Sequence, residues 1–240
     1  MANSTLLQLV GQAAGEMALA VPSTVIGNSQ SDVVQMLRLI NGLGGQLARE
    51  YQWQESIVEY RFSTVFYSYT GTTTNGSTTI SALSSTTGLT TNPTYFQVTG
   101  TGIPSDNYLV SVNAGAATAV MDIAATATGT VTLTFTQMRY ALPSAYDRQV
   151  DRTHWDRTQH WEMLGPDGSQ QWQWLKSGFI STGPRIRYRI YNNLFQIWPA
   201  IGAVHRLGFE YVSKNWVLAT AGTSPTKTAF AVDTDTCIFA

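Results

Sequence analysis

A stretch without any lysine or arginine, residues 66–136, most constrains what this chain can fold into. Thr, Ser, Gly and Ala dominate the stretch, and its only acidic residues are Asp106 and Asp122. Short β-prone runs such as Tyr95–Val98 and Thr130–Phe135 alternate with turn signals rich in Asn and Gly. This alternation predicts a small antiparallel β module inserted into a parent domain, because a disordered linker would lack it.

The residues before the insert predict two helices and a strand. Apolar side chains recur at helical spacing over 4–19 and again over about 31–51. Ser4 or Thr5 is expected to cap the first helix, and Ser31 the second. The short connection from Pro22 to Gln30 suits a helical hairpin. A strand is expected from Ile57 to Val65.

Two glycine-containing pairs weaken the middle of the second predicted helix. They are Asn41-Gly42 and Gly44-Gly45. Each interior glycine costs about 1 kcal/mol relative to alanine. Close packing of the helix backbone against a neighbour is therefore the interpretation we favour.

After the insert the parent domain resumes with one helix and three strands. Ser169–Lys176 is expected to be a helix capped by Gly178, and strands are expected at 186–190, 194–198 and 207–212. Asn192-Asn193 should form a tight turn between the first two of these strands. The predicted fold class is α+β: an N-terminal helical hairpin or bundle, a β-rich part and an inserted small antiparallel β module. The predicted domains are a body, 1–65 and 137–240, and the module, 66–136.

The composition favours a subunit of an assembly over a free monomer. Charged residues make up 12% of the 240-residue chain, about half of the usual ~25%. Little charge is then available to keep copies apart. The net charge of −1 gives no global case for nucleic-acid affinity. The first twenty residues lack Lys and Arg, so we expect no secretory signal, and no apolar run is long enough for a membrane span.

No catalytic constellation is visible in the sequence. No two of His154, His160 and His205 have the i, i+4 spacing of a helical metal site. Phosphate loops, dinucleotide-binding glycine motifs and nucleophile elbows are absent from the sequence. Cys237 has no evident histidine partner. We expect no catalytic residue, no metal site and no cofactor.

Most of the basic residues lie between Arg139 and Lys214. Three of these arginines each follow an aspartate directly, which favours ion-pair networks. The arginines of the 186–190 strand region have no such local partner; a neighbouring subunit's acids and a DNA channel both remain open as their partners. The candidate subunit-interface or channel residues are Arg148, Arg152, Arg157, Arg185, Arg187, Arg189, Trp155 and Trp172.

Several stretches outside the insert resemble one protein family. They are Leu6–Val10, Pro22–Asn28, Leu47–Gln54, Tyr140–Pro143, Trp155–Thr158, Gln171–Gly178 and Phe209–Trp216. In their order and combination these stretches resemble the head-to-tail adaptor proteins of short-tailed bacteriophages. The insert itself, above all Gly100–Pro104 and Ala124–Val131, is similar to Thr/Gly-rich β units common in phage structural proteins.

The resemblance implies a structural role in the virion and no enzymatic activity. Such adaptors form a ring, usually of twelve copies, beneath the portal protein. The ring extends the channel for double-stranded DNA, which is not read by sequence, and it docks a tail nozzle or another tail protein. The expected location is the neck or tail of the virion, after assembly in the host cytoplasm.

Two other functions stay open at this point. The insert carries Tyr95, Phe96, Asp106, Asn107 and Tyr108, which would suit a glycan-binding module of a tail spike or fibre. A virion-associated cell-wall hydrolase would need a pair of carboxylates, for which Glu50 and Glu55 are candidates.

Overall fold

The computed structural model describes residues 4–177, 185–220, 222 and 224–238. The protein is mostly β, with 35% strand against 20% helix. The described residues contain three α-helices. The predicted α+β class with an N-terminal helical bundle is therefore wrong. The two N-terminal helices do form, but their apolar faces pack on C-terminal residues as well as on each other, and no bundle results.

The chain divides into two compact units. The terminal unit consists of Met1–Tyr60, Pro143–Asp151 and Phe209–Ala240, and the central unit of Arg61–Leu142 and Arg152–Gly208. The division falls within two strands, β1 (Ile57–Ser63) and β14 (Arg206–Ser213). The domain boundaries expected at 65/66 and 136/137 stay a prediction.

Two helices begin the terminal unit. Helix α1 runs over Leu6–Glu16, and Thr5 caps it as expected, because its hydroxyl accepts from the Gln8 amide while the Gln8 side chain accepts from the Thr5 amide. Helix α2 covers Ser31–Glu50. Ser31 is not its cap: it is already helical, and Gln30 occupies the cap position without a side-chain bond.

The core of this unit joins both ends of the sequence. Helices α1 and α2 pack on residues within and next to two short paired strands, β15 (Val217–Leu218) and β16 (Thr236–Cys237). Strand β9 (Tyr146–Gln149) pairs antiparallel with β14, and the short helix η1 spans Gln54–Ser56. The buried residues of this core are Leu6, Val10, Ala14, Val25, Val33, Met36, Ala48, Trp216, Val217, Phe230 and Cys237.

One of the α2 glycines lies directly on a tryptophan. A Cβ placed on Gly44 would meet three carbons of the buried Trp216 ring. The close packing predicted for this part of the helix is thus confirmed at Gly44. It is wrong for Gly42 and Gly45, where a Cβ would have open space among the described residues.

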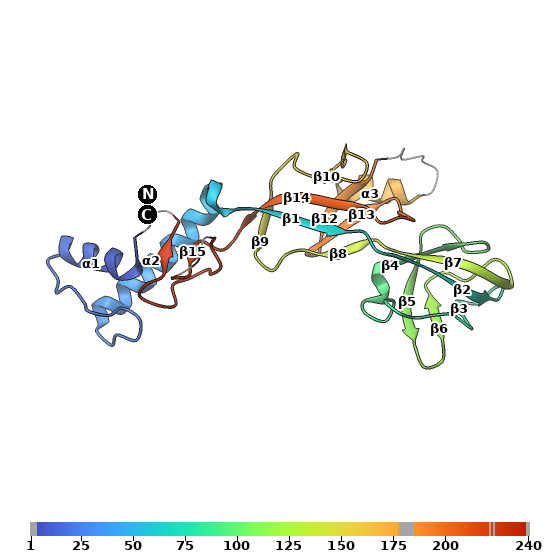
Figure 1. Cartoon of the computed structure of the whole chain (residues 1–240), viewed down its shortest axis with the longest axis horizontal. Helices are drawn as coiled ribbons and strands as arrows, with labels where there is room; N and C mark the ends of the chain where they lie inside the picture. Colours follow the sequence, from blue (N-terminus) through green and yellow to red (C-terminus); the bar gives the residue numbers. More distant parts are fainter. Residues whose placement is uncertain (1–3, 178–184, 221, 223, 239–240) are drawn as a thin grey trace. The chain divides into compact units, whose positions relative to one another are not determined.

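Six antiparallel strands of the central unit form a nearly closed, barrel-like sheet (Figure 1). In sheet order they are β2 (Phe66–Thr73), β7 (Gly129–Gln137), β4 (Phe96–Gly100), β5 (Asn107–Asn113), β6 (Thr118–Met121) and β3 (Thr79–Ile80). Two backbone hydrogen bonds between Thr72 and Ser81 link the first strand to the last. The short helix η2 (Pro93–Tyr95) precedes β4. The interior is apolar because alternate side chains point inward, among them Val98, Leu133 and Phe135.

A second sheet of the central unit has the order β12-β13-β8. Strands β12 (Arg187–Tyr191) and β13 (Leu194–Trp198) form a hairpin, and β8 (Arg139–Ala141) pairs with β13. Asn192 and Asn193 both have positive φ, as a two-residue hairpin turn requires, so the predicted tight turn is confirmed. Helix α3 covers Ser169–Lys176 as predicted. Its expected cap, Gly178, lies outside the described residues.

Two further strands complete the central unit. They are β10 (Trp155–Asp156) and β11 (Trp161–Glu162), which pair with each other. Strand β10 also pairs with β14, so the sheet order is β1-β14-β10-β11. These strands position Trp155 and the residues around it.

Candidate functional site

The sheet β12-β13-β8 places two arginines in one row. Gln196 of β13 lies opposite Arg189 of β12 on one side and opposite Arg139 of β8 on the other. Side chains that are directly opposite across a ladder lie on the same face. Arg139, Gln196 and Arg189 therefore share a face, and Tyr188 and Phe195 point to the opposite, buried face.

Arg189 is held from three sides. Its Nε donates a 2.9 Å hydrogen bond to Oε1 of Gln196. Its guanidinium lies 4.6 Å from the ring centre of Trp172 and 4.8 Å from that of Tyr191. Burial lowers the pKa of Arg189, Tyr191 opposes this, and the positive charge of Arg139 lowers the pKa further. Stacking on two rings and one hydrogen bond fixes this guanidinium in place.

Two cationic side chains, those of Arg139 and Lys176, lie over the ring of Tyr108 in the barrel. The guanidinium of Arg139 lies 5.3 Å from the ring centre, and Nζ of Lys176, from α3, lies 4.6 Å from it. Nζ of Lys176 also lies 3.1 Å from Oδ1 of Asp106. Burial, with the nearby Asp106 carboxylate, raises the pKa of Tyr108, so its hydroxyl stays neutral. We call Arg139, Lys176, Arg189 and Gln196 the cationic cluster.

Arg187 differs from its neighbours because its charge is already matched. Its Nη1 lies 3.1 Å from Oδ1 of Asp167, whose side chain is buried. An ion pair with a buried carboxylate fixes the start of β12 and balances the charge of Arg187 within its own unit. Arg187 thus pairs with an aspartate of its own unit, and contact of the candidate arginines with a neighbouring subunit or with DNA stays a prediction.

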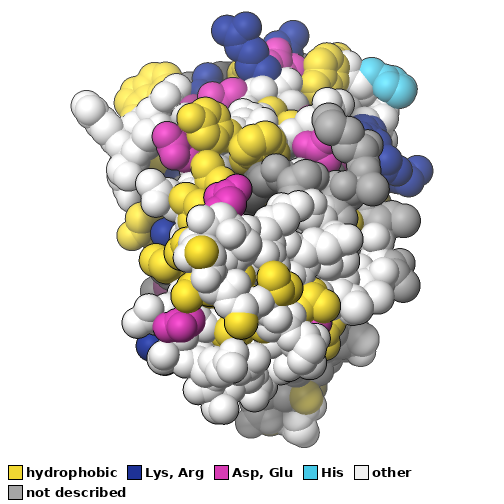
Figure 2. Space-filling view, turned by 90° about the vertical axis from the view of Figure 1, so that its left-hand side faces the viewer, with side chains coloured by type: hydrophobic (Ala, Val, Ile, Leu, Met, Phe, Trp, Pro, Cys, Tyr) yellow, Lys and Arg dark blue, Asp and Glu magenta, His cyan; other side chains and the backbone are white. Residues whose placement is uncertain are grey.

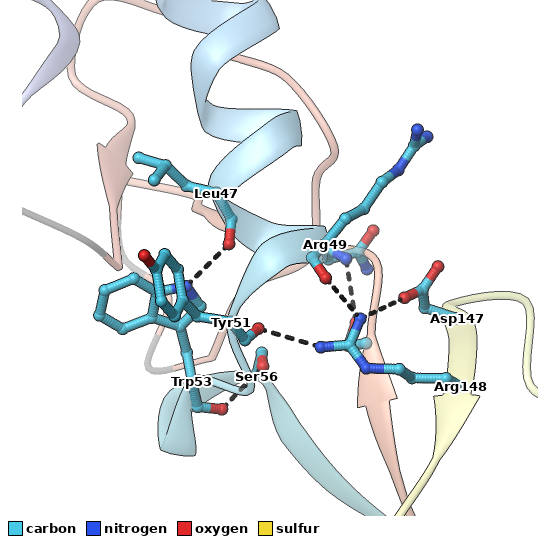
Figure 3. A network of polar contacts seen from close by, with 9 residues as sticks. Leu47, Arg49, Tyr51, Trp53, Ser56, Asp147 and Arg148 are labelled. Carbon is cyan, nitrogen blue, oxygen red and sulfur yellow. Dashed lines mark hydrogen bonds and ion pairs between the residues drawn. The ribbon is translucent and has the colours of Figure 1, made fainter.

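Arg148 holds the end of α2 in the terminal unit (Figure 3). Its two terminal nitrogens donate 3.0 Å hydrogen bonds to the carbonyl oxygens of Arg49 and Tyr51, and Nη1 also lies 3.1 Å from the carboxylate of Asp147. The last carbonyls of a helix have no partner within the helix, and a cation is favoured beside them. The indole N–H of Trp53 likewise donates a hydrogen bond to the carbonyl oxygen of Leu47, near the end of α2.

The remaining candidate residues lie at the surface of the central unit. Arg157 lies over Gly208, where its Nε would be 3.0 Å from an added Cβ. Arg152 has a left-handed backbone conformation, with φ of 62°. The exposed candidates are Arg152, Arg157, Arg185 and Trp155. Of the eight candidates, the structure brings Arg187, Arg189 and Trp172 to one region.

Three members of the cationic cluster were not among the candidates. Arg139 begins a short strand, Lys176 ends α3, and Gln196 is a polar residue in an apolar strand. A polar side chain amid Phe195 and Ile197 was a usable signal, because it must find a partner when buried. Which partner it finds depends on strand pairing.

Carboxylates and histidines of the described residues form no metal site. No group of three His, Cys, Asp or Glu side chains that could hold a metal ion occurs in the part of the chain that the structure describes. His205 Nδ1 lies 2.6 Å from Oδ2 of Asp156, and Oδ1 of Asp156 accepts from the amides of Thr158 and Gln159. This carboxylate orders the turn after β10. In the described ranges no helix is long and apolar enough to cross a bilayer.

The helices of the terminal unit carry an apolar surface. A groove of about 300 Å³ lies between α1, α2 and the Trp216 region. Its lining is Leu9, Ala13, Ile40, Leu43, Gly44, Leu47, Trp216, Phe230 and Cys237. On the face drawn in Figure 2, hydrophobic side chains are scattered among uncharged ones, and most of the charged side chains lie in the upper part of the view.

Comparisons with known proteins give no relative: no family model matches the chain, and no curated protein or solved structure is significantly similar to it.

Proposed function

We propose that this chain is a structural virion subunit, a head-to-tail adaptor whose copies form a ring below the portal of a short-tailed bacteriophage. The ring would have twelve copies, extend the DNA channel and dock a tail nozzle or another tail protein. The chain would act mechanically, as a subunit of the neck or tail, and not as an enzyme. The residue resemblance supplies this role, and the apolar surface of the terminal unit is the observation that carries it.

Large apolar side chains of α2 point outward. Leu39 and Leu43 are one helical turn apart, and 72% and 57% of their surface is exposed. Burying one leucine fully stabilises an assembly by about 1.5–3 kcal/mol. Within one copy this gain is not realised, so these side chains favour contact with another surface. The adjoining groove offers further apolar area.

A second copy of this chain can fill the groove, because the terminal unit itself exposes a matching apolar segment. The segment after α1 exposes three apolar side chains, Met17, Leu19 and Val21. Over residues 4–21 the only charged side chain is that of Glu16, the last residue of α1, so the contact carries little charge. An apolar segment of one copy on an apolar groove of the next is a heterologous contact. Repeated contacts of that type form a ring when the rotation between neighbouring copies closes, and an open filament when it does not.

The test is the mass of the purified protein, alone and mixed with a portal protein, by mass photometry and negative-stain imaging. We expect closed rings, alone or on the portal. Leu39→Ser with Leu43→Ser should weaken ring formation at least ten-fold, since about 1.4 kcal/mol corresponds to a factor of ten. Val110→Ser is the matched control, because Val110 is exposed to a similar degree on the barrel. A protein that stays monomeric and never joins a portal refutes the proposal.

A further inference from the structure

The cationic cluster holds more positive charge than its own residues balance. Lys176 is paired with Asp106. The side chain of Arg139 makes no hydrogen bond or ion pair with any described residue, and its guanidinium instead lies over the Tyr108 ring. The terminal nitrogens of Arg189 likewise donate to none of the described residues, because only its Nε is bonded. Two half-buried guanidiniums thus keep most of their donors for something else.

The sheet register sets how far apart these two arginines are. Arg139 and Arg189 flank Gln196 on neighbouring strands, so their Cα atoms are two strand spacings apart, about 10 Å. Long arginine side chains on one face of a sheet span that separation from both sides. Two guanidiniums on one face at this spacing can bind one anion that lies between them.

The surroundings orient the donors before any ligand arrives. Arg189 is fixed by Trp172, Tyr191 and Gln196, and Arg139 is fixed on Tyr108. Side chains that are already ordered lose less entropy on binding. Burial is the largest cause of the lowered pKa of Arg189, and the positive charge of Arg139 lowers it further. Two like charges in one region are unfavourable without an anion between them.

We propose that Arg139 and Arg189 form a binding site for a phosphate oxyanion. The planar fork of a guanidinium matches two oxygens of a phosphate, and two such forks favour phosphate over a halide. Either inorganic phosphate or a phosphodiester of nucleic acid presents this group. The site is independent of the proposed ring, because it lies within the central unit of one copy.

The experiment measures binding of inorganic phosphate by calorimetry and of a short duplex DNA by fluorescence anisotropy over a series of salt concentrations. Arg139→Gln should weaken binding about ten-fold, the loss of one charged contact. For DNA it should also reduce the slope of log K against log salt by about 0.9. Arg206→Gln is the control, since Arg206 is an exposed arginine of the same unit on β14 and should leave binding unchanged.

Each outcome decides the proposal. Loss of phosphate binding in Arg139→Gln alone assigns the site to free phosphate, and loss of DNA binding alone assigns it to the phosphodiester. Wild-type protein that binds neither, or equal losses in Arg139→Gln and Arg206→Gln, overturns the proposal. Arg139→Lys keeps the charge without the fork and serves if Arg139→Gln does not fold; it should bind several-fold more weakly than wild type. Ring formation by mass is a separate readout, so failure here leaves the adaptor proposal standing.

Discussion

Replacing Gly44 by alanine isolates the contact between α2 and Trp216. An alanine in a helix interior is favoured over glycine by about 1 kcal/mol. At Gly44 the new methyl group would lie within 2.5–2.6 Å of two indole carbons and closer still to a third. Ordinary contacts between carbons are about 3.5–4.0 Å, so the buried ring must move by about 1 Å. Such overpacking costs about 1–3 kcal/mol, and a large buried ring places this case at the upper end.

The expected net effect is a loss of about 2 kcal/mol for Gly44→Ala, the difference between a cost near 3 and a gain near 1. Gly45→Ala has open space and should gain about 1 kcal/mol, which makes it a matched control one residue away. At about 2–4 °C per kcal/mol for chains of this size, the two midpoints should differ by roughly 6–12 °C.

Thermal unfolding followed by circular dichroism at 222 nm is the assay, because α1 and α2 supply most of the helix and both belong to the terminal unit. Trp216→Leu combined with Gly44→Ala should remove the clash, so Gly44→Ala should cost nothing in that background. If Gly44→Ala and Gly45→Ala shift the midpoint equally, the close contact with Trp216 does not exist and the reasoning fails.

Two other perturbations test contacts of the terminal unit. Arg148→Met removes two hydrogen bonds to the end of α2 and should lower the unfolding free energy by about 1–2 kcal/mol. The expected loss is below the top of the usual range of about 1.5–3 kcal/mol for a charged donor, because Arg148 is partly exposed. Urea titration measures it, and an unchanged midpoint would contradict this role. Burial raises the pKa of Asp235, but hydrogen bonds from Lys227 and two backbone amides outweigh it and leave that pKa below its ordinary value. Because the folded pKa is the lower one, this stabilisation is complete above the unfolded pKa of about 3.9 and is lost as pH falls below it. Asp235→Asn should therefore flatten the stability profile below pH ~4, and an equally steep profile in the variant would disprove the assignment.

Local signals were sufficient for much of the secondary structure. The cap at Thr5, the helix at 169–176, the hairpin turn at Asn192-Asn193 and the strand at 194–198 all follow from residues within a few positions of one another. The fold class could not be predicted from such local signals. It failed because helical periodicity shows that α1 and α2 exist but not which residues cover their apolar faces. Those residues, such as Trp216 and Phe230, come from the other end of the chain.

The candidate site was likewise only partly predictable from the sequence. The charged face of β12 was readable from alternating arginines, but their partners were not, since Arg187 meets Asp167 and Arg189 meets Trp172 only after α3 folds back on the sheet. Sequence alone determined where the β stretch without Lys or Arg lies and that its strands alternate with turns, because both depend on adjacent residues. Only the tertiary structure decided that this stretch curls into a nearly closed barrel and that its Tyr108 supports Arg139 and Lys176. Strand pairing and ring contacts join residues far apart in the chain, and no local pattern specifies them.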